Sequence, residues 1–153
     1  MRKRLLSIAL VMILLLGLFP MSAFAANEIE DTEIIVFEDG SYLEISIVTS
    51  SARVANTVSG AKKYTYRDSN GNVDWEAKLN ATFAYSGAWY TCTTASCSLT
   101  ISDSQWYEIS KSTARGTNNA YAYLTMGRKV LGVTIERPEY TIQLTCDSNG
   151  NLS

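Results

Sequence analysis

The strictest constraint on the fold is a run of alternating side chains that begins at Val73. Polar residues fill most of the positions between the apolar ones, which are Val73, Trp75, Ala77, Leu79, Ala81, Phe83 and Tyr85. A period of two predicts a β-strand with one face in the core and the other in water. The run is longer than a usual strand, so we expect a bend or a bulge within it.

Shorter runs with the same period occur elsewhere in the chain. They are Leu43–Ile47, Cys97–Ile101, Tyr107–Ile109, Leu124–Met126, Val133–Ile135 and Tyr140–Cys146. Turn-forming residues separate them, namely Asp39-Gly40, Asn70-Gly71, Ser86-Gly87, Thr117-Asn118-Asn119 and Pro138. Many short strands at this spacing predict an all-β domain, an antiparallel β-sandwich for which an immunoglobulin-like arrangement is one candidate. A small β-barrel is the alternative.

The pentapeptide Asp-Ser-Asn-Gly-Asn occurs twice, at Asp68–Asn72 and at Asp147–Asn151. The flanking residues do not match, which argues against a duplicated unit. Each copy contains Asn-Gly, the pair that favours a type I′ hairpin turn. The alternating oxygens from Asp68 to Asp74 also suit a weak calcium site, but the glycine is misplaced and no glutamate closes the loop. We therefore predict two turns and no metal site.

The N-terminus has the pattern of a secretory signal peptide. A basic start at Met1–Arg4 precedes an apolar run to Phe19, and the small residues Ala23 and Ala25 precede a cleavage site between Ala25 and Ala26. The apolar run is shorter than the roughly 20 residues of a membrane span. We expect a secreted, extracellular product without a membrane anchor after cleavage. The remaining 128 residues, 26–153, suit a single domain.

The beginning of this domain is the part that the sequence defines least. Residues 26–33 are acidic and lack periodicity, which predicts a loose start. A hairpin is expected near residues 34–48, and small polar residues from Thr49 to Gly60 predict a connection. The segment 26–59 is either integrated into the domain, which we favour, or a loosely attached pro-segment.

Charge and composition narrow the function classes. Cleavage leaves ten basic and fifteen acidic residues, a net charge of −5 that argues against a nucleic-acid partner. The chain contains no histidine, which removes the usual general base, the usual zinc ligand and every Ser-His or Cys-His pair. We expect no enzyme, no catalytic residue, no cofactor and no metal. A small hydrolase built on carboxylates such as Asp74 and Glu76, expected on the outward strand face, is a third possibility.

Three cysteines occur in the exported part. Cys92 and Cys97 flank a four-residue connection that resembles a hairpin tip, so a disulfide between them is predicted. Cys146 shares the parity of Ile142 and Leu144, which predicts a core position. It is either free or an alternative partner, and closing the longer loop from Cys92 would stabilise the fold more, by roughly 4 against 2 kcal/mol.

Aromatic residues are the best candidates for a binding face. Strand parity places Trp89 outward if Cys92 faces inward, and Trp106 outward if its neighbours Tyr107 and Ile109 face inward. Tyr121 and Tyr123 oppose the apolar positions of their own strand. Exposed rings anchor protein interfaces and stack on sugars.

These rings favour a secreted, non-catalytic interaction protein that binds a protein or cell-envelope partner. A carbohydrate-binding module that uses the exposed aromatic residues is the alternative.

The stretch from Gly60 to Ser153 resembles small exported proteins of Gram-positive, often gut-dwelling, bacteria. The residues that carry the resemblance are Asn70-Gly71 leading to Trp75, Thr82–Tyr85, Cys92–Cys97, Met126–Val133 and Leu144–Asp147. The resemblance implies an exported bacterial protein. No activity is established for that group, so it implies no site residue.

Overall fold

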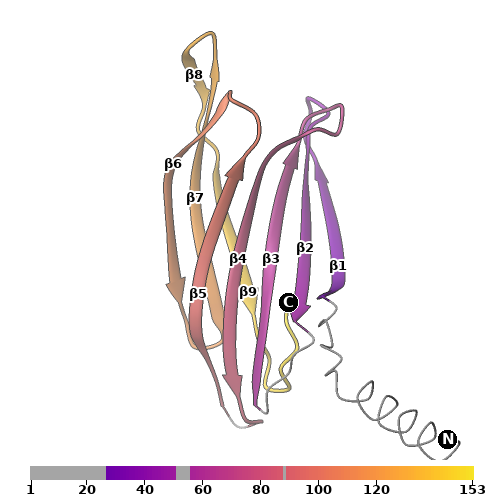
Figure 1. The fold of residues 1–153 in the computed structure, drawn as a ribbon, viewed down its shortest axis with the longest axis vertical. Coiled ribbons are helices and arrows are strands. Elements are labelled where there is room, and N and C mark those ends of the chain that lie inside the picture. Colours follow the sequence, from indigo (N-terminus) through magenta and orange to yellow (C-terminus); the bar gives the residue numbers. More distant parts are fainter. Residues whose placement is uncertain (1–26, 51–55, 88) are drawn as a thin grey trace, which may run out of the picture.

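The computed structural model describes residues 27–50, 56–87 and 89–153, which form nine β-strands and no helix (Figure 1). The strands are β1 (Asn27–Val36), β2 (Tyr42–Ser50), β3 (Thr57–Arg67), β4 (Val73–Tyr85), β5 (Tyr90–Ile101), β6 (Trp106–Arg115), β7 (Asn119–Val130), β8 (Val133–Glu136) and β9 (Glu139–Thr145). The predicted signal peptide and its cleavage site lie outside the described residues.

The strands form two antiparallel sheets that pack face to face. Sheet A contains β1 to β5 in chain order, and in sheet B β7 pairs with β6 along one edge and with β8 and β9 along the other. No strand pairing joins the two sheets within the described ranges. The predicted sandwich is therefore confirmed, and the sheets do not close into a barrel.

The strand order differs from that of an immunoglobulin domain. There the chain passes between the two sheets several times, whereas here the first five strands all belong to sheet A. The immunoglobulin-like arrangement is therefore wrong for this chain, although the sandwich itself is correct.

Strand β4 has the predicted alternation and forms the middle of the core. Its inward residues Trp75, Leu79 and Phe83 are completely buried. The aromatic side chains of Trp75 and Phe83 each bury about 150–250 Å², which stabilises the fold by roughly 4–6 kcal/mol per ring at about 25 cal/mol per Å². Sheet B covers them with apolar side chains of β7 and β9, namely Leu124, Met126, Ile142 and Leu144.

The expected irregularity in this strand is a β-bulge at Asp74. Tyr66 of β3 pairs with Trp75 and Arg67 pairs with Val73, which leaves Asp74 without a partner in that register. A bulge redirects side chains, and Asp74 is buried here. The prediction that Asp74 lies on the outward face beside Glu76 is therefore wrong.

The N-terminal hairpin is an integral part of sheet A. β1 pairs with β2, and β2 pairs with β3 from Tyr42 to Thr49. The predicted loose start at residues 26–33 is wrong, because β1 begins at Asn27. The predicted connection is also shorter than expected, since its ends belong to β2 and β3.

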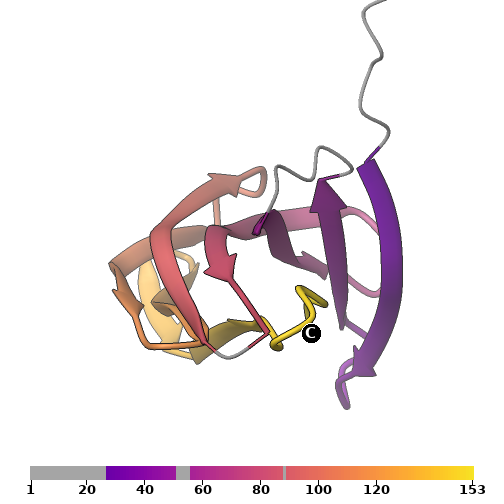
Figure 2. The same cartoon turned by 90° about the horizontal axis from the view of Figure 1, so that it is seen from below.

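The C-terminal end of the chain lies between the two sheets (Figure 2). The side chain of Leu152 is buried and packs directly on Gly60 of β3, where a Cβ atom would overlap it. This contact joins the last residues of the chain to sheet A.

The two pentapeptide copies form the same hydrogen bonds. In each, the aspartate Oδ1 accepts from two backbone N–H groups, and its Oδ2 accepts from the last asparagine at 2.9 Å (Asp68) and 2.7 Å (Asp147). Both are hairpin turns, as predicted. Only the glycines have positive φ, 87° at Gly71 and 83° at Gly150. A type I′ turn needs positive φ at both central residues, so that detail of the prediction is wrong.

Candidate functional site

Tyr121 and Tyr123 lie side by side on the outer face of sheet B. Their ring planes differ by 9° and their centroids are 6.1 Å apart. Tyr123 is 46% exposed and Tyr121 is half-buried. They alternate with the buried Ala122 and Leu124 on β7, so the predicted outward orientation is confirmed.

The nearest neighbours of this tyrosine pair are mostly polar and uncharged, and one carboxylate, Glu139 of β9, lies beside them on the same face. The residues paired directly with the two tyrosines are all exposed and are Ser112 and Ala114 of β6 and Thr141 and Gln143 of β9. The Gln143 amide donates to Asn119 Oδ1 at 3.3 Å, and the Thr145 hydroxyl donates to the same oxygen at 2.9 Å. The face therefore combines aromatic rings with hydroxyl and amide groups, which suits a neutral polar ligand.

Trp89 is exposed but belongs to another part of the molecule. It lies in the turn before β5 of sheet A, where its carbonyl accepts from Ser86 N–H at 2.9 Å, and 53% of it is exposed. The predicted exposure is confirmed. Its position does not place it with the tyrosine pair of sheet B.

Trp106 is not a surface residue, and that prediction is wrong. Only 3% of it is exposed, and its indole N–H donates to Asp74 Oδ2 at 2.9 Å. The register of β6 shifts at Ile109, and Tyr107 packs outward over Gly127, so the assumed inward parity of these two neighbours does not hold.

The same contact gives Asp74 a structural role. Burial raises the pKa of Asp74, and the hydrogen bond from Trp106 partly opposes that shift. Glu76 instead points outward and forms an ion pair with Lys63 at 3.3 Å. The two carboxylates therefore lie on opposite sides of β4 and do not form a hydrolytic pair.

The predicted Cys92–Cys97 disulfide is wrong because no hairpin tip separates these residues. Both lie on β5 and face the same way, with Cys92 opposite Phe83 and Cys97 opposite Leu79. Five residues along a strand span roughly 16 Å, whereas a disulfide needs Cα atoms within about 7 Å. No disulfide joins the three cysteines in this structure, and Cys146 is buried as predicted.

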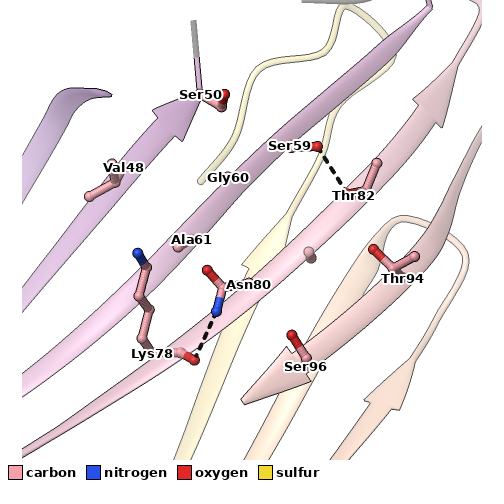
Figure 3. A pocket seen from close by; sticks show the side chains of 11 residues that line it. Val48, Ser50, Ser59, Gly60, Ala61, Lys78, Asn80, Thr82, Thr94 and Ser96 are labelled. Atoms are coloured by element: carbon pink, nitrogen blue, oxygen red, sulfur yellow. Dashed lines mark hydrogen bonds between the residues drawn. The ribbon is translucent and has the colours of Figure 1, made fainter. Parts of the chain in front are cut away.

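A shallow groove crosses the outer face of sheet A (Figure 3). Its volume is about 200 Å³, and small or polar residues of β2 to β5 line it, Lys78 and Asn80 of β4 among them. The Ser59 and Thr82 hydroxyls hydrogen-bond to each other at 2.9 Å. The groove contains hydroxyl groups but no aromatic ring.

A larger pocket of about 320 Å³, the end pocket, lies at the end of the sandwich between the β1–β2 turn and the segment that joins β8 to β9. Aromatic, acidic and small side chains line it, namely Phe37, Glu38, Asp39, Ser41, Tyr66, Trp106, Glu136, Pro138 and Tyr140. These residues come from the β1–β2 turn, β3, the start of β6 and the segment around β8 and β9. No local sequence pattern marks them, because each segment contributes only one to four residues.

The described part of the chain brings together no group of three or more His, Cys, Asp or Glu side chains that could hold a metal ion. It also contains no helix of the length and hydropathy needed to cross a membrane. No known protein family, curated protein or solved structure matches the chain.

Proposed function

We propose that this chain is an exported, non-catalytic binding module that attaches to a neutral glycan of the cell envelope or of another polysaccharide. The observation that carries this proposal is the stacked pair Tyr121 and Tyr123 on an exposed sheet face, where the residues paired directly with the two tyrosines are uncharged. Aromatic rings stack on the apolar faces of sugars, and the surrounding hydroxyl and amide groups hydrogen-bond to sugar hydroxyls.

The groove on sheet A is the weaker candidate for the same ligand. It offers hydroxyls from Ser59 and Thr82, but these two already bond to each other. It also lacks a ring for stacking and carries the charge of Lys78. The tyrosine face of sheet B therefore supports glycan binding better.

The carboxylates support a binding role rather than hydrolysis. A general acid needs a raised pKa in an accessible cleft. Asp74 has a raised pKa but is buried and bonded to Trp106. Asp39 in the end pocket has a lowered pKa, chiefly because the Ser41 hydroxyl donates a hydrogen bond to it.

Retention on insoluble polysaccharides, including peptidoglycan, tests the proposal with purified residues 26–153. We expect wild-type retention and a loss of affinity of about fivefold to 150-fold when Tyr121→Ala and Tyr123→Ala are combined, because two stacking contacts of about 0.5–1.5 kcal/mol each are removed. Trp89→Ala is the matched control, since it removes an equally exposed ring elsewhere. Equal retention of the double variant and the wild type would contradict the proposal.

A protein partner is the second candidate, and the β7–β8 hairpin favours it. Leu131 at its tip is 99% exposed, and Val130, Val133 and Ile135 beside it are exposed as well. The hairpin projects beyond the rest of the sandwich (Figure 1). Exposed apolar patches often mark protein interfaces.

Affinity capture with two variants separates this candidate from glycan binding. A protein partner at the hairpin would be retained by the wild type and by the double tyrosine variant, and lost with Leu131→Asp. A captured protein that depends on the tyrosines instead would exclude the hairpin as the interface.

We also propose that export allows a Cys92–Cys146 disulfide. Both thiols lie in the core, and their backbone N–H groups donate to the adjacent carbonyls of Thr117 and Asn118, each at 2.9 Å. Each thiol would lose one hydrogen while the disulfide of an exporting cell's oxidoreductase is reduced. Mass spectrometry of the denatured, exported protein should show one alkylatable thiol, Cys97. Three alkylatable thiols would contradict the bridge.

A further inference from the structure

The end pocket is walled by aromatic rings. The Tyr66 ring lies 5.7 Å from Phe37 and 5.0 Å from Trp106, measured between centroids. Beneath them Trp75 is completely buried and lies 4.9 Å from Tyr140. The rings therefore form one continuous cluster, whose upper members line the pocket.

Hydrogen bonds hold this wall in place without a ligand. The Tyr66 and Ser41 hydroxyls bond to each other at 2.7 Å, and Ser41 N–H donates to Asp39 Oδ1 at 3.0 Å. Trp106 is fixed by its bond to Asp74. The pocket is thus preformed, which reduces the entropy lost on binding.

The charges around the pocket are mostly negative. Glu38, Asp39 and Glu136 line it. Arg128 offsets part of this charge, because its Nη1 lies 3.5 Å from Glu136 Oε1. Its charge also helps the Ser41 hydrogen bonds to lower the pKa of Asp39. Glu38 and Asp39 have no ion-pair partner among the described residues.

Arg128 also shows what these rings attract. Its guanidinium carbon lies 5.7 Å from the centroid of the Trp106 ring, within the range of a cation–π interaction. One cation of the chain is therefore already held by an aromatic ring and a carboxylate at this end. The exposed side of the Phe37 ring, next to Glu38 and Asp39, offers the same kind of contact without an occupant from the chain.

We infer that this pocket binds a small organic cation with a substituted ammonium group. Ring faces carry negative electrostatic potential and bind such groups in aromatic cages, and the two unpaired carboxylates complement the charge. The volume of about 320 Å³ is in the range of small-molecule sites, so it admits an ammonium group with a short tail. This site is separate from the tyrosine face and does not depend on the proposed glycan binding.

Titration with choline, followed by tryptophan fluorescence and calorimetry, tests this inference on residues 26–153. The neutral isostere 3,3-dimethylbutan-1-ol is the matched probe, because it has the same shape without the charge. We expect choline to bind at least about tenfold more tightly, since cation–π contacts and carboxylates act only on the charged probe. Equal affinity for both probes, or binding of neither, would overturn the inference.

Substitutions then locate the site. The double variant Glu38→Gln and Asp39→Asn keeps the hydrogen-bond acceptors, and it should weaken choline binding about tenfold while leaving the alcohol unaffected. Glu139→Gln, on the outer face of sheet B, is the control and should change neither. Unchanged choline affinity in the double variant would overturn the assignment to this pocket.

Two further probes distinguish the sources of the cation. Nα-acetyl-lysine methylamide represents a basic side chain of a protein, and choline represents a free small molecule. Preferential binding of choline would support the inference as stated. Binding of the lysine probe with no response to choline would overturn it in favour of a protein partner.

Discussion

Aromatic side chains gather in two places in this molecule, and their surroundings differ. At the end of the sandwich, Trp75 and Trp106 are buried and Trp106 bonds to the carboxylate of Asp74. On the outer face of sheet B, Tyr121 and Tyr123 stack on each other among exposed hydroxyl and amide groups. The first group holds the two sheets together, whereas the second contributes little to the core and remains available to a ligand.

A third tyrosine on the same sheet face, Tyr107, shows that an outward orientation is not sufficient to leave a ring open to a ligand. Tyr107 packs over Gly127, where a Cβ atom would overlap its ring, and Lys129 Nζ lies 4.3 Å from the ring centroid. Its hydroxyl bonds to Thr134 at 2.8 Å. Residues of the chain itself therefore contact the Tyr107 ring and hydroxyl. The rings of Tyr121 and Tyr123 remain the part of this face that is open to a ligand.

The largest expected effect separates the two aromatic groups by stability. Trp106→Ala should lower the free energy of unfolding by about 3–5 kcal/mol, because it empties a core site and leaves Asp74 buried without its donor. Tyr123→Ala should change it by about 0.5 kcal/mol or less, as at other exposed sites. Urea denaturation of residues 26–153 measures both.

Trp106→Phe serves as a milder variant in case the alanine variant does not fold. It keeps a ring but removes the hydrogen bond, so its loss should be smaller than that of alanine. Equal losses for Trp106→Ala and Tyr123→Ala would contradict the division into structural and surface aromatic groups.

A medium effect is expected from Gly127→Ala, which tests how Tyr107 is held. The added methyl group meets the Tyr107 ring, and overpacking of this kind costs about 1–3 kcal/mol. Denaturation of the double variant with Tyr107→Ala should show less than the sum of the two single losses, because the clash is removed. Strictly additive losses would show that the two residues do not touch.

The smallest expected effect is on the pH dependence of stability, to which Asp74 and Asp68 contribute with opposite signs. Burial raises the folded-state pKa of Asp74 above its usual 3.8, so its contribution to stability grows as the pH falls through the folded-state pKa and is fully present below pH 3.8. Hydrogen bonds, chiefly from the Asn72 side chain, lower the pKa of Asp68, so its stabilisation is present above pH 3.8 and lost as the pH falls through its folded-state value.

Denaturation of the wild type and of Asp74→Asn from pH 7 to pH 4 measures the contribution of Asp74. The stability difference should shift in favour of the wild type as the pH falls. A shift in the opposite direction would show that Asp74 is stabilised in its ionised form.

Alternating patterns predicted the strands that have a clear buried face. β4 and β9 follow their apolar residues, and the orientation of Tyr121 and Tyr123 follows from the same rule. The sequence pattern predicts no part of β3 as a strand, because Gly60 and Lys62 occupy inward positions between buried neighbours. An apolar count along the chain does not recognise such a strand.

The errors at the candidate sites have local physical causes. The bulge at Asp74 and the register shift at Ile109 each reverse a side-chain direction, and parity along a sequence contains no signal for either. The Cys92–Cys97 prediction failed because a Thr-rich segment that resembles a turn continues as β5. The end pocket depends on segments far apart in the chain, so only the fold reveals it.

The central claim is that the open tyrosine pair forms the ligand-binding face. The most direct test is NMR chemical-shift mapping of ¹⁵N-labelled residues 26–153 with a soluble oligosaccharide of whichever polysaccharide retains the protein. The account predicts shifts concentrated at Tyr121, Tyr123, Thr141 and Gln143, with none at Tyr66 or Trp106. Shifts confined to the end pocket or to the groove on sheet A would contradict it.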